Sequence, residues 1–198
     1  MRLGSVSTGY RLNHDPSFAA LGFLAAIAFF VGSLFWQASR LPETLTATAE
    51  DSTQAPAAAV WLVLNTPGVL TERFDEVEVY EQTEDDLGLS AWTTRHEDRN
   101  YLTRFTRVEA VKGGSGGDDA APWIYSYSID AEDVPVRTLR EVRFVEQPDG
   151  STLITVTDQL TIEDSSLRMW MGVLGTDGGA KNELKALKSL AVSAKAAL

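Results

Sequence analysis

The chain has 198 residues, which is the size of one globular domain with a short additional segment. Its hydrophobic fraction of 44% and charged fraction of 23% are typical of folded domains and argue against disorder or a multi-span membrane protein. A net charge of -11 argues against nucleic acid as a partner. The sequence has no cysteine and two histidines, which excludes disulfides and thiolate catalysis and argues against a histidine metal cluster. No cofactor is therefore expected.

The first element in chain order is an apolar segment. Residues 18–36 are nineteen in number and contain no charged side chain. A helix of this length, rising about 1.5 Å per residue, roughly spans the ~30 Å hydrocarbon core of a bilayer. We therefore predict a tail at residues 1–16, a transmembrane helix at 17–37 and a linker at 38–42. The alternative is a cleaved secretory signal, but the apolar run is long for one and the nearby A-x-A at 47–49 lies well beyond it.

The orientation of this helix follows from the basic residues beside it. Arg2 and Arg11 precede the segment, whereas Arg40 alone follows it closely. Because lysine and arginine are enriched on the cytoplasmic side of membrane helices, this bias predicts that the N-terminus of this single-pass membrane protein lies inside. Its C-terminal domain is expected on the outer side, periplasmic or extracellular.

The domain at residues 43–198 begins with a short strand and a short helix. Thr44 to Ala49 alternates threonine with leucine and alanine, which indicates a strand, and Asp51 to Gln54 are typical of a turn or cap. Pro56 precedes a run of helix-forming residues at 57–64, which predicts two helical turns. A further turn is expected at Val69 to Arg73.

The period of the hydrophobic pattern then becomes two, which indicates strands. We predict six of them, at residues 74–82, 89–95, 101–112, 123–130, 136–147 and 152–162. A glycine-rich loop at 113–121 and a tight reversal at 148–150 are among the connections. Short connections join neighbouring antiparallel strands, so the product is a meander that curls.

The tail returns to helical spacing and predicts a long amphipathic C-terminal helix, interrupted by glycine 175, 178 and 179. Its apolar face is expected to oppose the sheet; it contains Leu167, Trp170, Met171, Leu174, Leu184 and Leu187. Another face carries Lys181, Lys185, Lys188 and Lys195. This lysine stripe is either a solvated surface or a contact with anionic lipid.

The order of these elements resembles the START-like superfamily, also called SRPBCC or polyketide cyclase/dehydrase-like, over residues 43–198. The resemblance rests on "AAAVWLVL", on Trp92 in "SAWTTR", on "PDGSTLITVTDQL" and on "LRMWMGVLGTDGGAKNELKALKSL". It implies an α+β helix-grip fold, in which a curved antiparallel sheet of about seven strands wraps around the long C-terminal helix. It also implies an apolar cavity that holds a lipid, polyketide or other hydrophobic molecule.

Candidate ligand-binding residues follow from the strand period and this resemblance. Trp123, Tyr125 and Tyr127 share one face of a strand, and tyrosine hydroxyls could orient a ligand. The full candidate set is Trp92, Trp123, Tyr125, Tyr127, Asp158, Trp170 and Leu174. The alternative is that these aromatic side chains simply fill the core.

Candidate catalytic residues are His96, Arg140, Glu141 and Asp158, and none is assigned a catalytic role. Asp158 interrupts an apolar alternation and is expected to face inward, paired with Arg140 or Arg143. The sequence contains no serine elbow, phosphate loop or metal-ligand spacing. We therefore predict a membrane-anchored, non-catalytic protein that binds a hydrophobic small molecule or lipid. The alternatives are a structural or interaction module of a membrane assembly and a small-molecule cyclase.

Overall fold

The computed structural model describes residues 16–38, 40–66, 77–96, 102–113, 121–132 and 134–195, and within the first helix the side chains of residues 20–36. The predicted helical turn at Val69 to Arg73 and most of the loop at 113–121 lie outside these residues.

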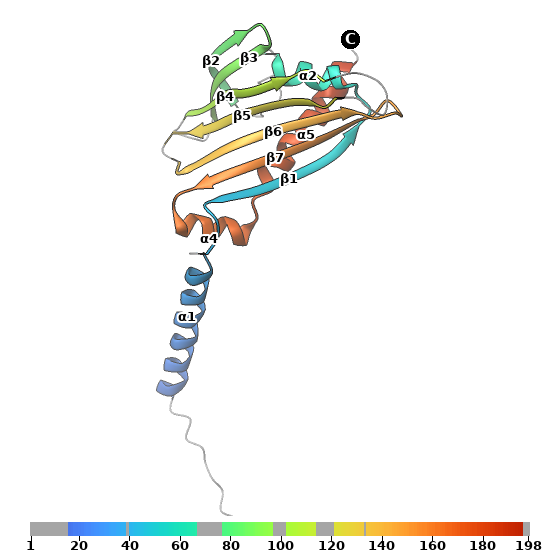
Figure 1. The fold of residues 1–198 in the computed structure, drawn as a ribbon. Coiled ribbons are helices and arrows are strands. Elements are labelled where there is room, and N and C mark those ends of the chain that lie inside the picture. Colours follow the sequence, from blue (N-terminus) through green and yellow to red (C-terminus); the bar gives the residue numbers. More distant parts are fainter. Residues whose placement is uncertain are drawn as a thin grey trace, which may run out of the picture.

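The domain is built on one seven-stranded antiparallel sheet (Figure 1). The strands follow the order β1-β7-β6-β5-β4-β3-β2, so β2 to β7 form the meander and β1 lies at the edge beside β7. The predicted strands are confirmed, with ends that shift by a few residues at most. The bounds are β1 Thr44–Thr53, β2 Val77–Asp85, β3 Gly88–His96, β4 Leu102–Val111, β5 Trp123–Ala131, β6 Val136–Glu146 and β7 Thr152–Ile162.

The first strand is longer than its sequence pattern indicated. Asp51 lies opposite Ile154 and Thr53 opposite Thr152 in the antiparallel register of β1 and β7. The prediction of a turn or cap at Asp51 to Gln54 is therefore wrong for residues 51–53, which belong to β1. Backbone pairing with β7 holds Asp51 in the strand despite the low strand propensity of aspartate.

Among the helices that the structure describes, α2 (Ala57–Asn65) and α5 (Gly178–Lys195) contact both the sheet and each other. The predicted two-turn helix is confirmed as α2, and the C-terminal helix α5 contacts α2, β1 and β7. Ala180, Leu184, Leu187 and Ala191 of α5 are buried in the core. Their spacing places them on one stripe of the helix, as the sequence predicted. The curved sheet with α5 against it agrees with the predicted helix-grip fold.

The C-terminal helical region is divided at the predicted glycine interruption, but into two separate helices and not one long helix. Helix α4, Ser165–Leu174, ends at Gly175, whose φ of 92° lies in the left-handed region that favours glycine. Helix α5 begins three residues later. The chain can therefore change direction between them, and α4 is not an extension of the helix that contacts α2 and β1.

This division also corrects the predicted apolar face. Leu167 and Met171 pack against a small cluster formed by Ala47, Leu160 and Ile162. By contrast, Trp170 is 56% exposed and Leu174 is 79% exposed, so neither opposes the inward residues of the sheet.

The N-terminal helix α1, Pro16–Ala38, is present where the apolar segment predicted a helix, and it projects away from the sheet (Figure 1). Within the residues that the structure describes, no helix meets the combined length and hydropathy expected of a membrane span. The prediction of a span at residues 17–37 therefore has no support from the structure, although the helix itself is there.

The burial of α5 gives a matched test of its role. We expect Leu187→Ala to lower the free energy of unfolding by about 2–5 kcal/mol, because Leu187 is fully buried and its truncation leaves a cavity. The control Leu174→Ala removes the same atoms from an exposed site of α4 and should change this free energy by less than about 0.5 kcal/mol. Urea denaturation measures both. Equal effects would contradict the placement of α5 in the core.

Candidate functional site

A cluster of aromatic side chains occupies the inward face of strands β3 to β6. The period of two along β5 places Trp123, Tyr125 and Tyr127 together, which confirms the predicted shared face. The aromatic cluster consists of Trp61 from α2, Trp92 from β3, Phe105 from β4, Trp123, Tyr125 and Tyr127 from β5, and Phe144 from β6.

The rings of the aromatic cluster are in continuous contact. Trp92 stacks on Phe105 with a centroid distance of 4.9 Å and an interplanar angle of 3°. Trp92 also approaches Tyr127 at 5.3 Å, and Tyr127 lies 5.9 Å from Tyr125. Tyr125 meets Trp61 edge to face at 6.0 Å. These separations are those of favourable aromatic pairs, so the cluster stabilises the fold as well as shaping this face.

The two ends of the cluster differ in exposure. Trp92, Tyr125, Tyr127 and Phe144 are essentially inaccessible to solvent, as core residues are. Trp61 and Trp123 are only partly buried, and their ring centroids are 5.4 Å apart. A molecule arriving from solvent can therefore reach this tryptophan pair, whereas the inner rings pack against one another.

Two polar groups lie at the tryptophan pair, one buried and one exposed. The Nε1 atom of Trp123 is buried and has no hydrogen-bond acceptor among the described residues. The ammonium of Lys112, an exposed residue, lies 5.7 Å from the ring centroid of Trp61. By contrast, the hydroxyl of Tyr125 donates to the carbonyl of Leu89 at 2.9 Å, so it is already engaged. A buried N–H without an acceptor is costly, which makes Trp123 a candidate donor to a ligand.

A second cluster, of buried charges, lies where α5 meets β6 and β7. The Nε and NH2 atoms of Arg140 donate to the two carboxylate oxygens of Asp158 at 2.6 and 2.7 Å. The NH1 atom of Arg140 donates to Oε2 of Glu183 at 3.2 Å. The predicted pairing of Asp158 with Arg140 is confirmed. The other candidate, Arg143, lies at the surface with its Nε 3.9 Å from Oε1 of Glu141.

The charge cluster holds Arg140 in its ionised form. Burial by itself would lower the pKa of Arg140, but the nearby Tyr127, Asp158 and Glu183 outweigh burial and raise the pKa above its ordinary value. A Cβ atom at Gly179 would lie 3.0 Å from both NH2 of Arg140 and Oδ2 of Asp158. The start of α5 therefore fits closely over the ion pair, which leaves no room for a substrate between them.

Glu183 is the member of the charge cluster that sequence reasoning missed. Its charge alone does not distinguish it, because α5 carries several charged residues. A signal was nevertheless present: Glu183 follows Ala180 by three residues and precedes Leu187 by four, so it falls on the apolar stripe. A carboxylate at such a position requires a buried partner.

The remaining candidate ligand-binding and catalytic residues belong to neither the aromatic cluster nor the charge cluster. Trp170 and Leu174 are exposed on α4 and do not join the aromatic cluster, which corrects their assignment as ligand-binding residues. Glu141 is partly exposed on β6, and the side chain of His96 lies outside the described residues. Among the acidic and histidine side chains that the structure describes, no group of three or more could hold a metal ion.

Three of the four lysines in the stripe on α5 make local contacts. Lys181 pairs with Asp177 and Lys188 with Asp51, while Nζ of Lys195 donates to the carbonyl of Gln54 at 3.0 Å. The hydrogen bond from Lys188 lowers the pKa of Asp51. These contacts are those of a solvated surface that also ties α5 to β1.

Comparisons with known proteins find similarity in structure alone. No family model and no curated protein matches the sequence. A point mutant of norcoclaurine synthase from Thalictrum flavum, in complex with a transition state analogue, is 14% identical with a TM-score of 0.56, covering 77% of this chain and 96% of that one. A conserved protein from Geobacillus kaustophilus is 14% identical with a TM-score of 0.54, covering 75% and 96%. A hypothetical protein from Helicobacter pylori is 8% identical with a TM-score of 0.55, covering 74% and 88%. The domain therefore has the START-like helix-grip fold.

The charge cluster gives a second stability test. Arg140→Met removes the counter-ion of two buried carboxylates, so we expect it to lower the free energy of unfolding at neutral pH by about 3–5 kcal/mol. The control Arg143→Met changes a half-exposed side chain on the same strand and should cost less than about 1 kcal/mol. Chemical denaturation measures both variants. A loss for Arg140→Met no larger than that of the control would show that the charge cluster contributes little.

Proposed function

We propose that the domain binds a hydrophobic small molecule, without catalysing a reaction, at the tryptophan pair of Trp61 and Trp123. The observation that carries this proposal is the partial exposure of these two contacting rings, which continue inward into the buried aromatic cluster. Flat apolar rings bind aromatic or aliphatic surfaces, and the unpartnered N–H of Trp123 can orient a ligand through an acceptor atom.

Similarity of fold supports small-molecule binding. Another structure of norcoclaurine synthase from Thalictrum flavum, 15% identical with a TM-score of 0.51, contains dopamine and hydroxybenzaldehyde. We transfer from that protein only the class of ligand, a small molecule with an apolar ring or chain, because a fold hosts many functions.

The arrangement of the charged side chains supports binding rather than catalysis. A cyclase would need an acid or base that reaches its substrate. Arg140, Asp158 and Glu183 expose 9% of their side chains or less and bind one another. In our proposal they hold the fold together, and the ligand contacts the tryptophan pair instead.

Membrane localisation is the second part of the proposal. Helix α1 carries exposed apolar side chains that include Phe29 and Trp36, and such a surface is stabilised by transfer from water into lipid. Recovery of the full chain in the soluble fraction of cells would contradict the attachment.

Ligand binding is tested with a fluorescent fatty acid probe titrated into the full chain. We expect saturable binding, and we expect Trp123→Phe to weaken it by up to about tenfold, because the variant keeps an apolar ring but loses one hydrogen-bond donor. The matched control Trp170→Phe makes the same change on α4 and should leave the dissociation constant unchanged. Thermal unfolding of both variants checks that the fold is intact.

Two results would contradict the binding proposal. The first is the absence of saturable probe binding to the wild-type chain. The second is an equal dissociation constant for Trp123→Phe and wild type. Either result would favour the alternative of a structural or interaction module, in which the aromatic cluster is core alone.

A further inference from the structure

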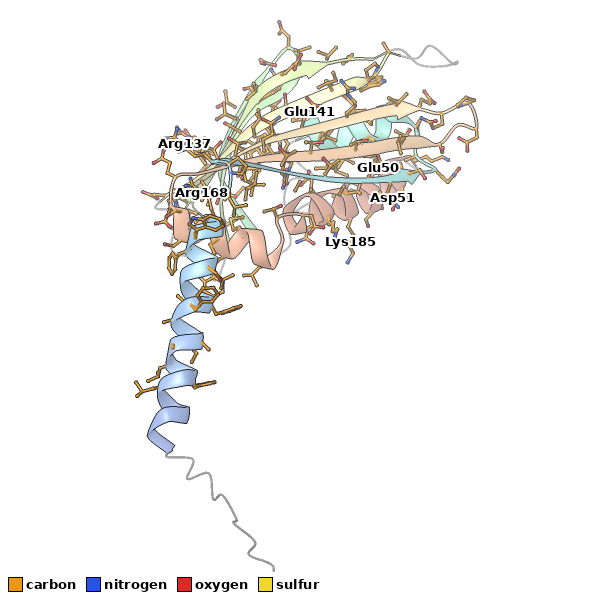
Figure 2. All side chains as sticks on the ribbon, turned by 60° about the horizontal axis from the view of Figure 1, so that its bottom comes forward. Glu50, Asp51, Arg137, Glu141, Arg168 and Lys185 are labelled. Carbon is orange, nitrogen blue, oxygen red and sulfur yellow. The ribbon has the colours of Figure 1, made fainter. Side chains whose placement is uncertain are left out.

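Helix α4 lies beside the end of α1 that is nearer the sheet. The two helices contact each other, and Figure 1 shows α4 at the end of the domain from which α1 projects. A Cβ atom at Gly172 of α4 would lie 3.2 Å from Cδ1 of Leu41, which follows α1 in the chain. The labelled Arg168 of α4 lies next to the same end of α1 (Figure 2). The exposed side chains of α4 are therefore close to those of α1.

The orientation of α4 is fixed by its other side. Arg168 is buried, and its NH1 atom donates to the carbonyl of Ile162 at 2.7 Å and to that of Glu163 at 3.3 Å. These bonds tie α4 to the end of β7. Trp170 and Leu174 are four residues apart, so they share one face of the helix, and both are exposed. The fold thus holds two large apolar side chains in solvent.

The exposed side chains of α1 indicate what covers this surface. At 100° per residue, the large apolar side chains point to all sides of the helix. They are Leu21, Phe23, Leu24, Ile27, Phe29, Phe30, Val31, Phe35 and Trp36. A protein partner or a second copy of the chain covers one side of a helix, whereas lipid surrounds it. At the end of α1, the guanidinium of Arg40 lies 3.9 Å from the ring centroid of Trp36. Tryptophan and arginine are typical of the boundary between headgroups and acyl chains.

We propose that Trp170 and Leu174 of α4 insert into the headgroup region of a lipid bilayer, beside α1. This inference rests on the proposed membrane attachment. Helix α4 is then a second contact with the membrane, and it fixes the tilt of the domain relative to the lipid surface. Burial of apolar area stabilises the contact, so vesicles of neutral phosphatidylcholine are sufficient and high salt does not release it. The proposed contact does not use the lysine stripe of α5, in which Lys181 and Lys188 pair with acidic residues.

Site-directed spin labelling tests this inference, because the chain has no cysteine and one introduced cysteine gives a single label. The full chain is reconstituted into phosphatidylcholine vesicles with a nitroxide at Leu174→Cys, at Phe30→Cys in α1, or at Val192→Cys, an exposed site on α5. Oxygen partitions into lipid, and a nickel chelate stays in water. We expect the ratio of oxygen to nickel accessibility at positions 174 and 30 to exceed that at position 192 severalfold, in 1 M salt as well.

The three labels separate the possible failures. A label at position 174 that is as open to nickel as the one at 192, with position 30 in lipid, would overturn the role of α4 and leave the attachment standing. Water exposure at both 30 and 174 would overturn the attachment as well. Protection of position 174 from both reagents would mean that protein covers α4, which also overturns the inference. Probe binding at the tryptophan pair is measured separately and decides the ligand proposal by itself.

Discussion

The contact of Arg140 with two carboxylates determines where α5 lies on the sheet. One arginine on β6 binds Asp158 on β7 through two hydrogen bonds and Glu183 on α5 through a third. The three side chains carry a net charge of one negative unit when all are ionised. The N-terminus of α5 lies at the Asp158 carboxylate, where the partial positive charge of the helix dipole stabilises a negative group. Gly179 permits this approach because it has no side chain.

The position of α5 leaves a different environment on the other part of the sheet. Helix α5 contacts β1 and β7, whereas the inward face of β3 to β6 carries the aromatic cluster, with α2 against part of it. Tyr127 belongs to the aromatic cluster and lies opposite Arg140 in the register of β5 and β6. The charge cluster and the aromatic cluster therefore meet at adjacent strands. One fixes the helix, and the other ends in the partly exposed tryptophan pair that we propose as the binding site.

Prediction from the sequence succeeded where a residue's place depends on local periodicity. The period of two located the six meander strands and the shared face of Trp123, Tyr125 and Tyr127, and the inward position of Asp158 followed from the same pattern. It failed where placement depends on a distant segment. Pairing with β7 extends β1 through Thr53. The glycines marked the break between α4 and α5, but the position of α4 depends on its packing against the distant strands β1 and β7. Trp170 and Leu174 were assigned to the wrong surface because the prediction placed the apolar residues of both helical segments on one face.

The central claim, that Arg140 joins α5 to the sheet through Glu183, is tested most directly by a double-mutant cycle. Arg140→Met, Glu183→Leu and the double variant are compared with wild type by urea denaturation. The account predicts a coupling free energy of about 1–3 kcal/mol, because each single variant leaves a buried charge with fewer partners and the double variant removes both groups. A coupling free energy of about zero would contradict it, since the two side chains would then contribute to stability independently.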